Sequence, residues 1–392
     1  MNPAGDARPL RIAILNRFAP PDGAPTAAAA SDLARDLAAA LPHALITLYA
    51  SEARYGAGDP VAGAAGLPVR RVASLYAGKW PPARLAASLF EGWALARRAA
   101  READVVISLT DPPLLSLWVG AACRRRGRRW IEWTLDRYPE FFAAAGLVSE
   151  RHPLYRRLAR WDAGLRPDAV IGLGEGQLRH LAHRRGPLPA SVIVPVGLVP
   201  LPCPAAPPSP AMNAPPTLVY AGNLGEAHNP AALAAIVGRA GPDRFRFTFA
   251  VSGRHAGGLR RALAGHPAVS WRDHLSLAEL AAADVHLVSL VGRATHLAVP
   301  SKAVSAVCLG RPFLFAGSAE ADTWQGLGDA GWLIAERPDG TLDPAAIDAA
   351  LAALADPAQR QGRAEAARVL AAGLHRRREE AVAELAALIT AF

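Results

Sequence analysis

The sequence predicts an α/β protein with two domains, each a parallel β-sheet covered by helices on both faces. Three observations predict this class. The 392 residues exceed what a single core usually holds. Short apolar segments alternate along the whole chain with Ala- and Leu-rich segments, as strands alternate with crossover helices in parallel sheets. An uncharged, proline-rich stretch at 199–216 interrupts this alternation near the middle and is typical of a semi-rigid linker.

The elements follow in order from the apolar segments. An amphipathic helix is expected over 27–41, because Leu33, Leu37 and Leu41 recur every four residues on one face. The chain from Asp343 onward is expected to be helical, and its last helix either stays with the second domain or packs back on the first. The predicted domains are therefore 1–198 and 217–392, joined by the linker 199–216. The predicted strands are 11–15, 45–49, 104–109, 130–133, 169–172, 192–196, 217–221, 245–251, 269–272, 285–290 and 312–316.

Composition excludes several classes of protein. A hydrophobic content of 51% with 20% charged residues excludes a disordered chain. The three cysteines are widely separated and have no metal-ligand spacing, which argues against a disulfide framework and for a reducing compartment. No apolar segment is long enough and sufficiently free of proline to suggest a membrane span. We therefore expect a cytoplasmic protein.

Three sequence motifs are missing, and one anion-binding pattern is present. The chain has no Gly-x-Gly-x-x-Gly after its first strand, no P-loop motif and no Asp-x-Asp. A metal-free enzyme acting on a diphosphate would need cations and helix N-termini instead. Val299-Pro-Ser-Lys302 leads into a helix predicted over 303–309, and Lys302 is one of only two lysines in the chain. This pattern predicts an anion site, with an ordinary capped helix and a surface lysine as the alternative.

Several segments, in this order along the chain, resemble those of family 4 glycosyltransferases. The first half contributes the glycine-bearing loop 20–26 and the segment 133–140, which is similar to the family's Asp-x-x-Pro-Glu segment. The second half is most similar to the branch with a Val-Pro-Ser-Lys helix. Its matching segments are Tyr220-Ala-Gly-Asn-Leu-Gly225, 285–290, Val299-Pro-Ser-Lys302, Gly310-Arg-Pro312 and Gly331-Trp-Leu-Ile334. The resemblance covers nearly the whole chain.

The resemblance implies the GT-B fold, with two Rossmann-like domains whose parallel sheets face each other across a cleft. It implies metal-independent transfer of a hexosyl group, with retention of configuration, from a nucleotide-sugar donor on the C-terminal domain to a hydroxyl acceptor. No cofactor is expected. Asp136 and Glu140 would be the catalytic residues, facing the sugar or the acceptor. The loop residues Asp22 and Gly23 would lie near the donor phosphates. The donor-binding residues would be Gly222, Asn223, Gly225, Ser301, Lys302 and Ser305.

Simpler explanations exist for some of these residues, and the sequence departs from the family pattern. Gly222 and Gly225 could form a plain tight turn, and Asp136 could cap a helix. Family members commonly carry two glutamates at the positions of Leu297 and Ser305. Glu226 and His228 replace a basic residue that often follows the glycine turn. These departures leave open a catalytically degraded GT-B protein that acts as a binding or scaffold subunit. A nucleotide-sugar epimerase on the same fold is a more distant alternative.

The positive charge lies entirely in the first half of the chain. Residues 1–198 contain 26 Lys and Arg against 17 Asp and Glu, a net charge of +9, whereas residues 199–392 contain 17 of each. Arginine clusters there are interleaved with tryptophan and leucine, which suits an anionic membrane face and a lipid-linked phosphate acceptor. We therefore expect a role in polysaccharide biosynthesis at the inner membrane face. Nucleic acid is not an expected partner, because no recognised binding module is present. The alternative is that the arginines only solvate the surface.

Overall fold

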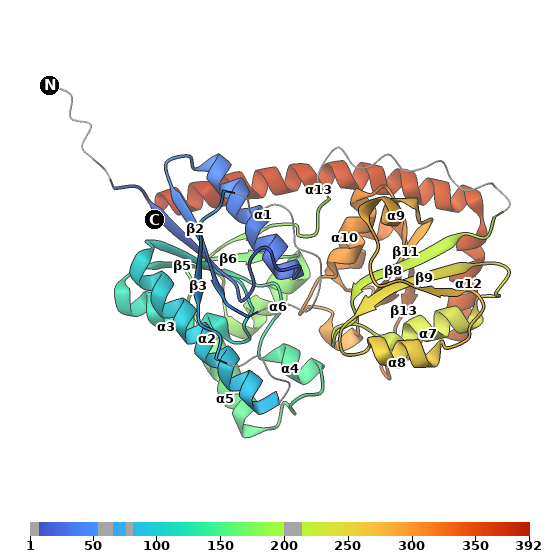
Figure 1. Ribbon diagram of the computed structural model, residues 1–392, viewed down its shortest axis with the longest axis horizontal. Helices are drawn as coiled ribbons and strands as arrows, with labels where there is room; N and C mark the ends of the chain where they lie inside the picture. Colours follow the sequence, from blue (N-terminus) through green and yellow to red (C-terminus); the bar gives the residue numbers. More distant parts are fainter. Residues whose placement is uncertain (1–7, 54–65, 76–80, 200–213) are drawn as a thin grey trace. The chain divides into compact units, whose positions relative to one another are not determined.

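The computed structural model describes residues 8–53, 66–75, 81–199 and 214–392 (Figure 1). Residues 200–213, which make up most of the predicted linker, and Lys79 lie outside the described residues. The chain divides into two compact units. Unit 1 extends to Val194 and also includes Arg378–Phe392, and unit 2 is Pro195–Arg377. The long last helix, α13 (Pro357–Ala391), therefore contributes residues to both units.

Unit 1 contains a seven-stranded parallel sheet in the order β3-β2-β1-β4-β5-β6-β7. Because β1 pairs with β2 on one side and with β4 on the other, the loops that follow β1 and β4 leave the sheet at its topological switch point. The strands are β1 (Arg11–Leu15), β2 (Leu45–Ser51), β3 (Val69–Val72), β4 (Val105–Ser108), β5 (Arg129–Trp133), β6 (Ala169–Gly172) and β7 (Ala190–Ile193). The helices are α1 (Pro25–Ala40), α2 (Pro81–Glu102), α3 (Leu115–Arg126), α4 (Glu140–Ala144), α5 (Pro153–Ala163) and α6 (Glu175–Arg185).

The core of unit 1 lies between the sheet and the helices α2 and α3. Leu15, Leu95, Val106 and Val119 are fully buried there. Trp130 joins this core, and its indole Nε1 donates a hydrogen bond to Ser108 Oγ at 2.9 Å. The buried indole N–H is thus satisfied within the sheet.

Unit 2 contains a six-stranded parallel sheet in the order β10-β9-β8-β11-β12-β13, with its switch point between β8 and β11. The strands are β8 (Thr217–Asn223), β9 (Arg246–Ser252), β10 (Val269–Trp271), β11 (Val285–Ser289), β12 (Phe313–Gly317) and β13 (Gly331–Ala335). The helices of this half are α7 (Pro230–Arg239), α8 (Ala256–Ala262), α9 (Leu277–Ala282), α10 (Ser301–Cys308), α11 (Asp322–Leu327), α12 (Pro344–Ala355) and α13, with the short 3-10 turns η1 (Gly292–Ala294) and η2 (Gly328–Ala330).

The predicted class of two parallel-sheet α/β domains is confirmed. All the predicted strands are present, and the last strand of the first half is shifted, because β7 ends at Ile193, before Pro195. Two edge strands had not been predicted. One is β3, where two of the four residues are arginines, so no apolar run marks the strand. The other is β13, which pairs only with β12. Among the described residues, no helix combines the length and the apolarity that a membrane span needs.

Candidate functional site

In unit 2, the predicted donor residues gather where β8 ends and α10 begins. Lys302 Nζ donates a hydrogen bond to the carbonyl oxygen of Asn223 at 3.1 Å. Gly222 adopts a φ of 108°, which favours glycine, and a Cβ there would lie 3.3 Å from Lys302 Cε. The glycine therefore allows the lysine side chain to pack directly on the turn.

The ammonium of Lys302 has an unusual environment. It lies 3.3 Å from His228 Nε2 and 5.1 Å from the centroid of the Tyr220 ring. Within the described part of the chain, no carboxylate forms an ion pair with it. Burial lowers its pKa to about 8. At neutral pH, Lys302 is thus a largely protonated cation without an anionic partner among the residues of unit 2 that the structure describes.

His228 fixes this lysine from the other side. Its Nδ1 lies 2.7 Å from the carbonyl oxygen of Ser289. A carbonyl can only accept, so Nδ1 carries the proton and Nε2 accepts a hydrogen bond from the Lys302 ammonium. Burial, together with the charge of Lys302, lowers the pKa of His228 to about 3, so the ring is neutral at pH 7. The sequence identified His228 only as a departure from the family pattern.

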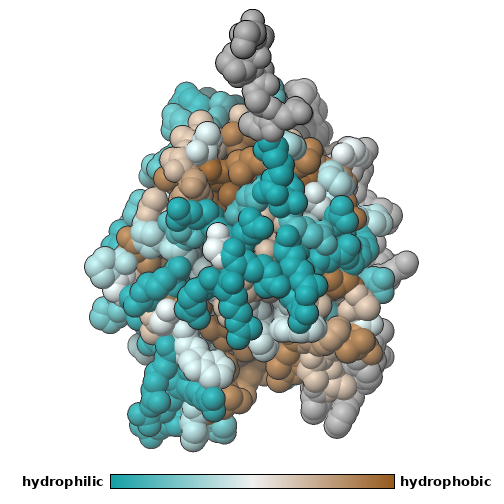
Figure 2. All heavy atoms as spheres, turned by 90° about the vertical axis from the view of Figure 1, so that its left-hand side faces the viewer, coloured by the Kyte–Doolittle hydropathy of each residue, from teal (hydrophilic) through white to brown (hydrophobic). Residues whose placement is uncertain are grey.

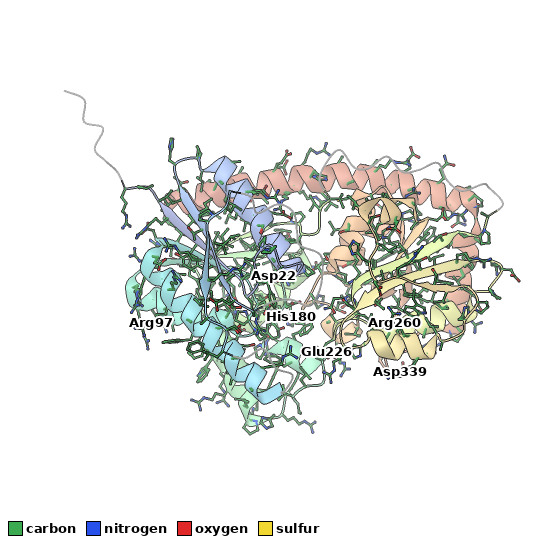
Figure 3. All side chains as sticks on the ribbon, in the orientation of Figure 1. Asp22, Arg97, His180, Glu226, Arg260 and Asp339 are labelled. Atoms are coloured by element: carbon green, nitrogen blue, oxygen red, sulfur yellow. The ribbon has the colours of Figure 1, made fainter. Side chains whose placement is uncertain are left out.

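A cationic group does stand beside the glycine turn, but it comes from another loop. Glu226 Oε1 accepts from Arg254 Nη1 at 2.7 Å, and Glu226 Oε2 lies 3.1 Å from His255 Nε2. Figure 3 labels Glu226 in the loop between β8 and α7. Gly253, with a φ of 94°, directly precedes Arg254, and a Cβ at Gly253 would collide with Oδ1 of Asn223. Arg254 was not predicted, although β9 pairs in parallel with β8 and the loop after β9 leaves the sheet at the same edge as the turn.

The two serines of α10 differ in their surroundings. Ser301 is the first residue of the helix and packs against Gly197, where a Cβ would lie 2.7 Å from Ser301 Cβ. Pro300, at the N-cap, offers no side-chain cap to the first N–H groups of the helix. Ser305 donates its hydroxyl to the carbonyl oxygen of Gly197 at 2.8 Å, so only its lone pairs remain for a ligand. Leu297, at the other expected glutamate position, is buried.

In unit 1, the predicted loop residues lie between β1 and α1. Figure 3 labels Asp22 there. Its Oδ2 is 3.9 Å from Nη1 of Arg71, whose Nη2 donates to the carbonyl oxygen of Pro20 at 2.9 Å. Gly23 lies between Asp22 and Ala24, the N-cap of α1. Arg71, from the unpredicted strand β3, therefore holds the loop that carries both predicted residues.

Asp136 follows β5 at the carboxyl edge of the sheet and is partly buried. Its backbone N–H donates to Thr110 Oγ1 at 3.2 Å, and burial raises the pKa of its carboxyl group to about 6. Asp111, in the loop after β4, has its pKa raised to about 7 by burial and by the negative charges of Asp136 and Glu91, against the opposing charge of Arg17. Asp111 was not predicted, although its place directly after a predicted strand was a usable signal.

Glu140 lies in a buried cluster of ion pairs. Its Oε1 is 3.4 Å from Arg137 Nη2 and 3.4 Å from Arg184 Nε. The cluster consists of Glu132, Arg137, Glu140, Asp162, Arg184 and Arg185. Two guanidinium groups thus neutralise Glu140, whereas Asp136 has no ion pair with a described residue. The structure favours a structural role for Glu140, and its catalytic role stays a prediction.

No protein-family model and no curated protein matches the sequence. The structure resembles sucrose-phosphate synthase from Thermosynechococcus elongatus, with a TM-score of 0.70 and 14% identity over 97% of this chain and 98% of that one. It also resembles WaaG, a glycosyltransferase involved in lipopolysaccharide biosynthesis, with a TM-score of 0.68 and 16% identity over 97% and 100% of the chains. Together with the two parallel sheets, these similarities show a two-domain, Rossmann-like GT-B fold. The narrower family 4 assignment stays a prediction.

Proposed function

We propose that this protein is a glycosyltransferase that moves a hexosyl group from a nucleotide-sugar donor to a hydroxyl acceptor. The observation that carries the proposal is Lys302, a partly buried ammonium that has no carboxylate partner in the described part of the chain. It lies at the start of α10 and against the turn that ends β8, where a parallel sheet binds its ligands. The two GT-B neighbours support the proposal through their fold.

The chemistry of this site suits a departing diphosphate. When the bond between sugar and phosphate breaks, negative charge develops on the leaving phosphate. In our proposal the ammonium of Lys302 and the first N–H groups of α10 stabilise that charge, so that transfer needs no metal. Gly222, Asn223 and Gly225 let the backbone approach the diphosphate, and Ser301 and Ser305 offer hydroxyl groups. Retention of configuration is part of the proposal and rests on the resemblance to family 4.

The acceptor belongs to unit 1 in this proposal. Asp136 would orient the acceptor hydroxyl or accept its proton, because a carboxyl with a pKa of about 6 is largely ionised yet basic at neutral pH. Asp22 and Gly23 would face the donor from the loop after β1. The net charge of +9 on residues 1–198 supports a phosphate-bearing, lipid-linked acceptor at the inner membrane face, and hence a role in polysaccharide biosynthesis.

A second candidate is a GT-B protein that has lost catalysis and acts as a binding or scaffold subunit. Leu297 and Ser305 favour it, because they replace the expected glutamates and Ser305 already donates to Gly197. A hydroxyl binds a ribose more weakly than a carboxylate does.

Calorimetric titration with UDP-, GDP- and dTDP-sugars tests the proposal. We expect one nucleotide class to bind, and Lys302→Met to weaken that binding by about two orders of magnitude, as for the loss of hydrogen bonds to a charged group. Arg244→Met is the matched control, since Arg244 is an exposed cation of unit 2 that stacks on Phe245. Binding without turnover would favour the scaffold. No binding of any nucleotide sugar, or equal binding by Lys302→Met, would contradict the donor site.

A further inference from the structure

Unit 1 carries a large apolar groove outside its candidate acceptor site. The groove has a volume of about 870 Å³ and lies among α2, α3, α5 and the segment that follows α4. Its wall includes leucines from α2 and α5 and tryptophans from α3 and α5. Representative lining residues are Leu85, Leu89, Trp118, Leu147, Leu154 and Trp161. Among the described residues, the charged side chains of the lining are those of two arginines, Arg124 and Arg160.

The exposed apolar side chains of the groove lie next to one another, unlike the single leucines scattered over most protein surfaces. Leu147 and Leu154 are each 56% exposed, and Trp161 is 50% exposed. Contiguous apolar patches of this kind mark binding surfaces in soluble proteins. Figure 2 shows one face of unit 1, where brown apolar side chains lie beside rows of elongated teal hydrophilic ones.

The form of this surface indicates a ligand with a hydrocarbon chain. Pockets for small ligands have volumes of about 300–1,000 Å³ and mostly apolar walls with a few polar groups, as this groove does. Helices that insert into a bilayer present a protruding apolar face instead. A groove suits a chain that leaves the bilayer and is enclosed along its length.

The charges at the groove indicate the head group of that ligand. The arginine run at the end of α3, from Arg124 to Arg126, is exposed, and α3 contains no acidic residue. Arg157 stacks on Trp161 with its Cζ 4.6 Å from the ring. The one acidic residue of α5, Asp162, is buried in the ion-pair cluster, so it does not offset these cations at the surface. An anionic group, above all a phosphate, complements this rim.

The groove adjoins the candidate acceptor site. Leu114 and Leu117 line the groove and also line a small cavity that is bordered by Thr110 and Asp136. The two spaces therefore share a wall. Arg124 lies in the last turn of α3, about 10 Å along the helix axis from Leu117, so a phosphate held there lies at the end of the groove away from Asp136.

We propose that this groove binds the hydrocarbon chain of a phosphate-bearing lipid, with Arg124 and Arg160 holding the phosphate. This goes beyond the proposed function and does not rest on it. The groove itself makes a separate claim, namely binding of a long-chain phosphate by unit 1.

Titration of the full-length protein with farnesyl phosphate, followed by tryptophan fluorescence and calorimetry, tests this proposal. Farnesol and inorganic phosphate are the two comparison ligands. We expect farnesyl phosphate to bind, farnesol to bind at least about tenfold more weakly, and inorganic phosphate to give no measurable binding. The double variant Arg124→Gln/Arg160→Gln should reduce the affinity for farnesyl phosphate to that for farnesol.

Leu154→Asp probes the groove wall, and Leu277→Asp is its matched control. Both leucines are exposed and lie at the start of a helix, Leu154 in α5 and Leu277 in α9 of unit 2. We expect Leu154→Asp to lower the affinity for farnesyl phosphate at least about tenfold and Leu277→Asp to leave it unchanged. Nucleotide-sugar binding, measured on every variant, reports an intact unit 2, and the near-ultraviolet circular dichroism reports intact packing in unit 1.

Several results would overturn the groove proposal. One is equal binding of farnesyl phosphate by Leu154→Asp and the native protein. Another is binding to phosphatidylglycerol vesicles without binding of farnesyl phosphate, which would indicate a bilayer-facing patch. Self-association that Leu154→Asp abolishes, without lipid binding, would indicate a second copy of the chain. Failure of the donor site gives a different pattern, in which farnesyl phosphate binds but no nucleotide sugar does.

Discussion

The two units share one architecture, but the ionisable groups at the carboxyl edges of their sheets have opposite charges. Each is a parallel sheet whose strand order reverses once, and each gathers polar groups beyond the carboxyl ends of its strands. In unit 1 these groups include Asp111 and Asp136, whose pKa values burial raises to about 7 and about 6. In unit 2 the group is Lys302, whose pKa burial lowers to about 8. Burial thus brings all three groups toward neutral pH, from opposite sides.

The opposite charges suit the two edges to different ligands. A partly buried cation that lacks an anionic partner among the described residues suits a diphosphate, and carboxyl groups poised near neutral pH suit a hydroxyl that must lose its proton. In our proposal, the same strand-loop geometry therefore serves two reactants through the charge of a few side chains. Four substitutions test whether the two edges bind different reactants.

Replacing the cation should have the largest effect. Lys302→Met keeps the apolar stem and removes the charge, so the transition state loses its stabilising ammonium. We expect the rate of sugar transfer to fall by about 10²–10³-fold. Steady-state kinetics with the nucleotide sugar identified by titration measures it. A variant with native kcat/KM would show that the cation of unit 2 plays no part in transfer.

Removing the carboxylate of unit 1 should come next. Asp136→Asn should lower kcat by about 10²-fold, the lower end of the range for general acid–base catalysis. The native rate should also fall tenfold per pH unit below about pH 6, where Asp136 becomes protonated. Because folding raises this pKa, the native state gains protons relative to the unfolded state between about pH 4 and 6, and Asp136 costs stability as the pH rises through that window.

Asp136→Asn should therefore raise the melting temperature at pH 7 while it lowers activity. Asp136 is partly buried, so the sign of the change in melting temperature is the firm expectation. Differential scanning calorimetry at pH 4 and pH 7 compares the melting temperatures of the variant and the native protein. A variant that melts below the native protein at pH 7 would contradict the raised pKa of Asp136.

The neighbour of the lysine should have a moderate effect. His228→Ala removes the acceptor of Lys302 and the bond to Ser289, which leaves the ammonium less well positioned. We expect the KM of the donor to rise about five- to tenfold, with a smaller change in kcat. In the native protein the KM should also rise above about pH 8, as Lys302 loses its proton. An unchanged KM in His228→Ala would show that His228 does not position the lysine.

The smallest effect concerns the glycine turn. Gly222→Ala forces a Cβ into a backbone with φ of 108° and places it 3.3 Å from Lys302 Cε, so we expect a loss of about 1 kcal/mol in the free energy of unfolding. Gly238→Ala in α7 is the matched control, because a Cβ there meets nothing within 4 Å, and it should gain up to about 1 kcal/mol. Urea denaturation of the two variants compares them, and equal stabilities would contradict a structural need for Gly222.

The strands that consist of apolar runs could be predicted from the sequence, and so could the site residues that lie in recognisable motifs. Gly222, Asn223 and Lys302 could be predicted to meet, because the ends of neighbouring parallel strands share an edge. Arg254 follows β9, the parallel neighbour of β8, so its place at the turn was open to the same argument. The place of His228 was not, since the fold alone brings it between Ser289 and Lys302. Glu140 was chosen from a local segment, but its surroundings come from Arg184, forty-four positions further along the chain. A segment predicts neither the burial of a carboxylate nor its partner.

The most direct test of the central claim uses the scarcity of lysine in the chain. Lys79 and Lys302 are the only two lysines, so protein labelled with carbon-13 at lysine Cε gives two signals. We expect one signal to titrate near pH 8 in the free protein and to shift to a higher pKa when a nucleoside diphosphate binds, since the diphosphate stabilises the ammonium. That signal should be missing from Lys302→Met. If the Lys302 signal titrates like a free lysine, and no nucleotide moves it, unit 2 does not hold a donor diphosphate at Lys302.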